Sequence, residues 1–222
     1  MKLTNDQWRV IALWTPYQEY SEMEKLAKDS NVDGHERAFT YCLIGSASKR
    51  TDSCKGSKCS VGPPQCVPPF ERIGDYHTHP HGRDEFSVGD VNYSLRVRNS
   101  FHCVGAIVDH KYTTPEGSME VPVFTTMCEA FDVAHPLYEK HKARIMEVSE
   151  RLHKTELDFG KRVYEEKQTI PEGEWKTYKE GKVEYEKRKK EAEEAGVIIK
   201  ASINQGIDES FGRVERKLTE LL

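Results

Sequence analysis

The sequence predicts an α/β (α+β) fold, in which a mixed β-sheet is flanked by helices and followed by a charged helical extension. Two observations support this fold class. Over residues 1–135, short apolar and β-branched segments alternate with helical patterns. Residues 137–222 instead hold 19 basic and 19 acidic residues around narrow apolar stripes at helical spacing. We therefore expect one domain over 1–135 and a helical extension over 136–222 that serves docking or oligomerisation.

The first domain is predicted to begin with a short apolar element around Trp8–Trp14 and a helix over residues 18–28, where helix-forming side chains predominate. The aromatic and β-branched segment Phe39–Ile44 lies between two glycines and predicts a strand. Residues 46–69 then include four prolines and predict a long inserted loop. A loop of this length inside a compact domain is either functional or mobile.

The following elements surround a group of histidines. Arg72–His77 predicts a second strand, and a helix is expected from Ser87 to Arg98. The continuous apolar run Phe101–Val108 predicts a buried third strand. Glu120–Met127 predicts a fourth strand, which we expect near a sheet edge because Pro122 cannot donate a hydrogen bond to a ladder.

Beyond Pro136 the pattern becomes helical. A first apolar stripe has spacings of three, four and seven and consists of Ile145, Val148, Leu152, Phe159 and Val163. Gly160 and Pro171–Gly173 interrupt it, and Trp175–Ala195 is a very polar helical segment. A second stripe consists of Ile203, Ile207, Phe211, Val214, Leu218 and Leu221. Such a seam buries itself either against its own chain or against a partner helix.

The overall charge excludes some classes of partner. The 222 residues contain 33 basic and 37 acidic side chains, for a formal net charge of -4, so the chain has neither a strongly basic nucleic-acid surface nor a polybasic membrane anchor. The longest apolar run, Val10–Trp14, is far too short to span a bilayer, and the N-terminus lacks the pattern of a secretory signal. We therefore expect no nucleic acid, no membrane and a cytoplasmic location.

The six cysteines fall into two groups. Cys42, Cys103 and Cys128 lie inside apolar runs and are expected to be small core residues. Cys54, Cys59 and Cys66 lie in the inserted loop, at spacings that do not fit a zinc ribbon. These three are expected to be free thiols, or to pair Cys54 with Cys59 or Cys66 in an oxidising compartment or a thermophile.

The chemistry is concentrated between the second strand and the following helix. His77 and His79 are two residues apart on a strand, so both imidazoles lie on one face and can bind one ion. Ser87 and Asp90 are three residues apart on the first turn of a helix, where Asp90 offers a carboxylate as a third ligand. Two imidazoles, one carboxylate and an open position are typical of a catalytic zinc site. Without the histidines, Ser87 and Asp90 would indicate only a helix cap.

This spacing resembles the JAMM motif, also called MPN+, of a family of zinc metallopeptidases. The motif reads His-x-His-Pro, six residues, Ser, two residues, Asp, and every fixed position is filled here from His77 to Asp90. The resemblance covers roughly residues 10–130. It implies a cytidine-deaminase-like core, with Zn²⁺ held by His77, His79 and Asp90 and with Ser87 stabilising an oxyanion.

The resemblance also implies a glutamate on an upstream strand as general base. Counted back from Gly45, the usual position of that base falls on Ala38, two residues after Glu36. Glu36 shares the strand parity of Ala38, so an extension or bulge would keep it on the same face, and we expect Glu36 to be the base. Asp75 is the main rival, either as an alternative base or as a hydrogen-bond partner that orients an imidazole.

The leading functional expectation is a zinc-dependent metallopeptidase or isopeptidase that acts on a protein or peptide, such as one carrying a ubiquitin-like modifier. Residues 81–86 depart from the Gly-rich and Trp-containing segment of eukaryotic deubiquitinating members, so substrates other than ubiquitin fit equally well. The alternative is a non-catalytic MPN scaffold that assembles a complex, or a homo-oligomer, through its helical extension. A nuclease is a weaker third option, because the sequence lacks a basic, aromatic-interleaved surface pattern.

Overall fold

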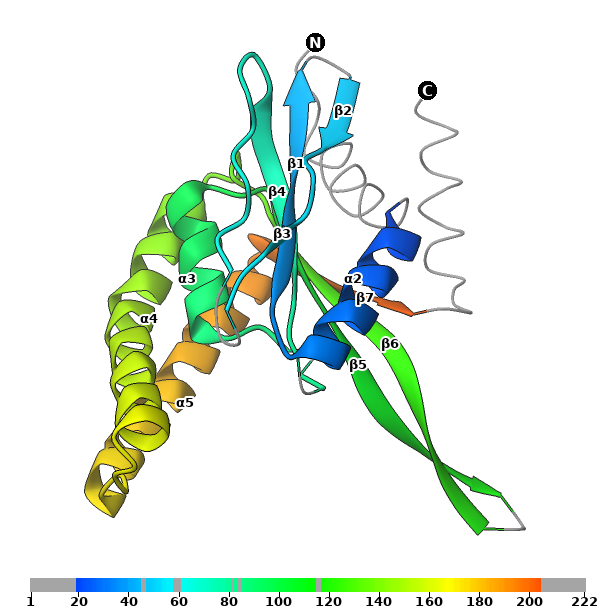
Figure 1. Ribbon diagram of the computed structural model, residues 1–222. Helices are drawn as coiled ribbons and strands as arrows, with labels where there is room; N and C mark the ends of the chain where they lie inside the picture. The colour runs from blue at the N-terminus through cyan, green and yellow to red at the C-terminus, as the bar shows by residue number, and fades with distance from the viewer. Residues whose placement is uncertain are drawn as a thin grey trace. The chain divides into compact units, whose positions relative to one another are not determined.

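A mixed β-sheet with α-helices forms the protein, as the sequence predicts (Figure 1). The computed structural model describes residues 19–44, 47–57, 61–80, 82–83, 85–114 and 117–204. The strands of this part are β1 Arg37–Ile44, β2 Ala47–Arg50, β3 Cys54–Lys55, β4 Glu71–Thr78, β5 Phe101–Thr114, β6 Gly117–Phe131 and β7 Ile198–Asn204. Its helices are α2 Tyr20–Asp33, α3 Val88–Val97, α4 Tyr138–Gly160, the π-helical turn η1 Lys161–Glu165 and α5 Glu172–Glu194.

The chain divides into two compact units. The first comprises residues up to Glu85, Asn99–Ala130 and the residues from Lys200, and the second comprises Phe86–Arg98 and Phe131–Ile199. The expected boundary after residue 135 is close to the transition at Phe131. Because α3 groups with the second unit and the last described residues group with the first, neither unit is one continuous stretch of chain.

The sheet places the histidine-bearing strand at its centre. Its order is β2-β1-β4-β5-β6-β7, and β3 pairs with the outer side of β1. β4 pairs with β1 in antiparallel and with β5 in parallel orientation, so β4 is hydrogen-bonded on both sides. The four strands predicted from the sequence are all confirmed, and β5 and β6 extend beyond the predicted bounds into a long antiparallel hairpin (Figure 1).

Two expectations about elements are wrong. The predicted loop 46–69 contains β2 and β3, which both pair with β1. Residues 198–204 form β7 and not a helix, so Ile203 does not begin a helical stripe. The remaining residues of that stripe, and the element expected around Trp8–Trp14, lie outside the described residues. By contrast, the expected place of β6 near a sheet edge is confirmed, because among the described strands only β7 follows it in the sheet order, and Pro122 lies opposite Asp109 of β5.

Helix α2 covers one face of the sheet in the first unit. It packs mainly against β5, with further contacts to β4 and β1 (Figure 1). This face is apolar: Phe39 contacts Tyr76, and the Tyr76 hydroxyl donates to the Met23 carbonyl at 2.8 Å. Since neighbouring residues of a strand point to opposite faces, Asp75 and His77 must project from the other face. The strand therefore separates an aromatic core from a polar face.

The second unit is a group of packed helices. α3 packs against α4 and α4 against α5, around a shared apolar core. Four of the five residues of the first predicted stripe are buried there: Ile145, Val148, Leu152 and Phe159. Val163 lies in the π-helical turn η1, which follows α4 directly, and it is exposed. In the described part of the helical extension, this apolar stripe is thus buried mainly against neighbouring helices and α3.

Two disulfides correct the predictions for the cysteines. Cys42 of β1 is bonded to Cys66, and Cys103 of β5 is bonded to its cross-strand partner Cys128 of β6. Cys42, Cys103 and Cys128 are fully buried as expected, but they are not thiols. Cys54 is a free thiol whose pKa is raised by burial, and Cys59 lies outside the described residues.

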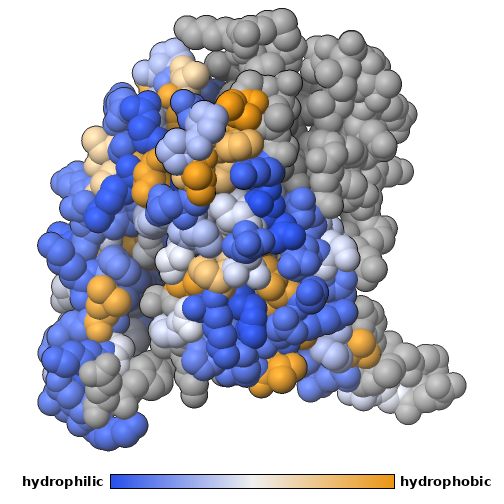
Figure 2. Space-filling model, turned by 45° about the horizontal axis from the view of Figure 1, so that its top comes forward, coloured by the Kyte–Doolittle hydropathy of each residue, from blue (hydrophilic) through white to orange (hydrophobic). Residues whose placement is uncertain are grey.

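The described helices include none that is long and apolar enough to span a membrane. On the face shown in Figure 2, hydrophilic side chains predominate and hydrophobic ones form small groups among them. The expected cytoplasmic location stays a prediction, and the disulfides count against it, since such bonds are rare in the cytosol of mesophiles.

Candidate metal centre

The end of β4 brings two imidazoles together. His77 is the second-last residue of the strand, and His79 follows it, held by a backbone hydrogen bond from its N–H to the Gly105 carbonyl of β5 at 2.9 Å. The Nε2 atoms of His77 and His79 are 2.8 Å apart. The ring of His77 is buried and that of His79 is half-buried. The prediction that the two histidines share one face is therefore confirmed.

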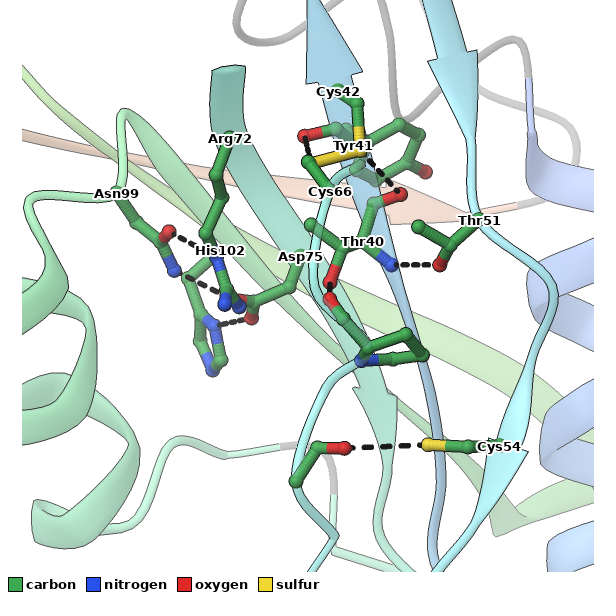
Figure 3. Close-up of polar contacts among 12 residues, drawn as sticks. Thr40, Tyr41, Cys42, Thr51, Cys54, Cys66, Arg72, Asp75, Asn99 and His102 are labelled. Carbon is green, nitrogen blue, oxygen red and sulfur yellow. Dashed lines mark hydrogen bonds and ion pairs between the residues drawn. A yellow bond between two sulfur atoms is a disulfide. The ribbon is translucent and has the colours of Figure 1, made fainter. Parts of the chain in front are cut away.

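Asp75 lies on the same face of β4 and accepts hydrogen bonds from three side chains (Figure 3). The Arg72 guanidinium and the Asn99 amide donate to its Oδ2, and Nδ1 of His102 donates to its Oδ1. Arg72 also donates from Nε to Oδ1 of Asn99 at 2.9 Å. Burial alone would raise the pKa of Asp75, but His102 and Arg72 outweigh it and lower the pKa to about 2.

A carboxylate held in this way is a poor general base. Asp75 is completely buried, and donors already occupy both of its oxygens, so it has no route to a water on the surface. The geometry favours the second of the two roles expected for Asp75, that of a partner orienting an imidazole.

His102 connects Asp75 to the histidine pair. It is the cross-strand partner of Asp75 in the parallel β4–β5 ladder, and its ring centroid is 4.9 Å from that of His77. Donor atoms of Asp75, His77 and His102 all lie within 4.8 Å of one another. The first unit therefore contains buried histidine and aspartate side chains that could bind a metal ion, and their nitrogen and oxygen donors suit a borderline cation.

Ser87 and Asp90 belong to the second unit, where they form a capping box at the start of α3. The Ser87 N–H donates to Oδ2 of Asp90 at 2.7 Å, and the Asp90 N–H donates to Oγ of Ser87 at 3.2 Å. These two bonds hold the rotamers of both side chains. Ser87 is exposed, so its hydroxyl is accessible to a ligand.

Glu36 immediately precedes β1 and is buried, with 8% of its surface exposed. Its backbone is held by the inserted segment, because its N–H donates to the Ser57 carbonyl and its carbonyl accepts from the Gly56 N–H, both at 2.8 Å. Ala38, the usual base position, is the cross-strand partner of His77. Continuing the antiparallel register by two residues on each strand brings Glu36 level with His79. The β1–β4 ladder shifts register once, between Tyr41 and Cys42.

Sequence reasoning missed three residues of this centre: Arg72, Asn99 and His102. His102 lies outside the His77–Asp90 motif, so the motif assigns it no role. The available signal was its place at the second position of a predicted buried strand, where a polar side chain needs a partner. The partner could not be named, because it depends on the register between β4 and β5.

Comparison with known proteins adds no relative. No family model matches the chain, and neither the curated proteins nor the solved structures include a match. The motif and the geometry of these side chains are therefore the features that point to a function.

Proposed function

We propose that this protein is a zinc-dependent metallopeptidase or isopeptidase of the JAMM type, built on the cytidine-deaminase-like core of that family. Its substrate would be a protein or peptide, such as one carrying a ubiquitin-like modifier. The observation that carries the proposal is the convergence of His77 and His79, whose Nε2 atoms are 2.8 Å apart at the end of a buried strand. A tetrahedral ion with bonds of about 2.1 Å holds two nitrogens about 3.4 Å apart, so a small side-chain rotation would admit it.

Asp90 is the third ligand in this proposal. The segment that joins His79 to Asp90 can span about 3.3 Å per residue, which is enough for both side chains to bind the same ion. The capping box with Ser87 restricts the Asp90 rotamer, which reduces the entropy lost on binding a cation. Two imidazoles and one carboxylate match the ligand set of hydrolytic zinc sites.

The remaining residues have separable roles. When bound, zinc would polarise the scissile carbonyl and acidify a water molecule. Glu36, level with His79, would accept the proton of the attacking water and pass it to the leaving amine. The Ser87 Oγ accepts the Asp90 N–H, and its hydroxyl proton would donate to the oxyanion that develops on the substrate.

Cleavage assays test the proposal. The probes are ubiquitin joined through its C-terminus to a lysine side chain of a labelled peptide, the corresponding linear fusion, and a mixed peptide library. We expect zinc-loaded wild type to cleave at least one probe and Glu36→Gln to lose activity by at least about 100-fold. Glu71→Gln is the matched control, because Glu71 is an exposed carboxylate at the start of β4. Failure of the zinc-loaded protein to cleave any probe would contradict the proposed activity.

The alternative is a non-catalytic scaffold that uses its helices for assembly. One observation favours it: α4 and α5 expose the apolar side chains of Leu157, Trp175 and Val183, which are 61%, 41% and 70% exposed. A scaffold would form a concentration-dependent oligomer or complex in which these side chains become protected, and it would show no hydrolysis. Light scattering over a range of protein concentrations, run beside the cleavage assay, separates the two functions.

A further inference from the structure

A row of polar side chains crosses the face of the sheet that carries His77. The ladders pair Thr40 of β1 with Asp75 of β4, Asp75 with His102 of β5, and His102 with Glu129 of β6. All four side chains are buried, with exposed fractions of 2% or less. Burying such a row is costly unless its members are hydrogen-bonded. Asp75 lies two residues before His77 on β4, so this buried polar row adjoins the histidine pair.

Asp75 is the fixed point of this row. Its three donors come from different parts of the fold: Arg72 from the same strand, Asn99 from the segment before β5, and His102 from β5 itself (Figure 3). Arg72 and Asn99 are also bonded to each other. The Asp75 carboxylate cannot rotate without breaking several buried hydrogen bonds. Each broken bond would leave a buried polar group without a partner, which costs free energy.

The bond from Asp75 fixes His102, and His102 in turn contacts His77. Donation from Nδ1 to Asp75 sets both the ring plane of His102 and the nitrogen that carries its proton. The His77 ring contacts two imidazoles, His79 at 4.6 Å and His102 at 4.9 Å between centroids. The His102 ring, held by Asp75, therefore packs against the His77 ring and limits its rotation.

We infer that Asp75 and His102, locked by Arg72 and Asn99, are positioning residues that hold the His77 imidazole in the orientation required to bind the metal. This inference rests on the proposed zinc site and specifies how its rigidity is produced. Neighbours that orient metal-binding histidines commonly contribute about 10- to 100-fold in metal affinity. A second metal bound by Asp75, His77 and His102 is disfavoured, because the cation would lie beside the guanidinium that already contacts Asp75.

The test uses Co²⁺ as the probe, because its visible absorption reports ligand geometry. His102→Phe keeps a flat ring beside His77 but removes the bond to Asp75, and Asp75→Asn replaces the carboxylate while preserving its shape. Thr40→Val is the control, because Thr40 is buried in the same row and its hydroxyl donates to the Pro64 carbonyl and not to Asp75. Each full-length variant is titrated with Co²⁺ and checked for folding by circular dichroism.

We expect wild type and Thr40→Val to bind one Co²⁺ with the same affinity and spectrum. His102→Phe and Asp75→Asn should bind about 10- to 100-fold more weakly, with shifted absorption bands. A purely structural role would lower the melting temperature and leave the spectrum and affinity unchanged, and that result would overturn the inference. Binding of two Co²⁺ ions per chain would also overturn it, in favour of a second metal site.

Two further results keep the inference separable from the proposed function. If wild type binds no Co²⁺, the zinc site itself is wrong; if wild type binds and both variants match it, only the positioning role is wrong. Should Asp75→Asn fail to fold, nitrogen NMR of wild type decides. We expect the proton of His102 on Nδ1, and a proton on Nε2 alone would contradict the bond to Asp75.

Discussion

The Cys42–Cys66 disulfide allows a quantitative prediction about the inserted segment. The bond joins residues separated by 24 positions and ties the segment carrying β2 and β3 back to β1. Closing a loop of that length lowers the entropy of the unfolded chain by about 12 cal/mol/K, which corresponds to about 3.5 kcal/mol at 25 °C. Cys66→Ser should therefore lower the free energy of unfolding by about 3.5 kcal/mol, since the Cys42 thiol that remains is a small apolar core residue.

Urea titrations followed by circular dichroism measure this effect. With a slope of about 1–3 kcal/mol/M, the loss corresponds to a midpoint lower by roughly 1.2–3.5 M. Cys54→Ser is the matched control, because Cys54 is a free thiol in the same segment, and its midpoint should remain near that of wild type. Reduced wild type should behave like Cys66→Ser if the other disulfide is protected by its burial. A Cys66→Ser midpoint equal to that of oxidised wild type would refute the reasoning.

Three other predictions follow from individual side chains. Ser87→Ala should lower turnover by about 100-fold or more through the lost oxyanion donor, and should cost about 1 kcal/mol of stability through the lost helix cap; equal turnover in a steady-state assay would exclude the oxyanion role. Gly105→Ala should destabilise the protein by about 1–3 kcal/mol, because the added Cβ would clash with Tyr76 and lie 2.9 Å from the Phe124 ring; an unchanged melting temperature would contradict that packing. Because the Asp75 pKa is lowered from 3.8 to about 2, its contribution of about 2 kcal/mol is present above pH 4 and is lost as pH falls toward 2. As pH falls from 4 to 2, the free energy of unfolding of the metal-free wild type should thus decrease more steeply than that of Asp75→Asn. Urea titrations at several pH values measure both, and equal slopes for the two proteins would contradict the lowered pKa.

The sequence was most informative where a local pattern decides the structure. The strand around His77 and the helix from Ser87 to Arg98 follow from alternation and a capping box, and both are confirmed. Strand spacing also gave the shared face of His77 and His79, because that face depends only on residue parity.

The errors arise where distant pairing decides the structure. Val197 and Ile198 follow a long polar helix, and the turn at Gly196, where the backbone φ is 73°, was the signal that the helix ends before β7. Disulfide connectivity and the Asp75–His102 contact depend on which strands are neighbours and in which register. A single sequence does not specify either, since many pairings satisfy the same local patterns.

The most direct test of the proposed metal centre is the zinc content of the purified protein and of two matched variants. Mass spectrometry of wild type dialysed against metal-free buffer should find about one zinc atom per chain, as expected of a mononuclear catalytic site. His79→Asn should lose most of it, while His135→Asn, a half-buried histidine of the second unit, should retain it. Wild type that holds no zinc even after zinc is supplied, or His79→Asn that holds as much as wild type, would contradict the proposed site.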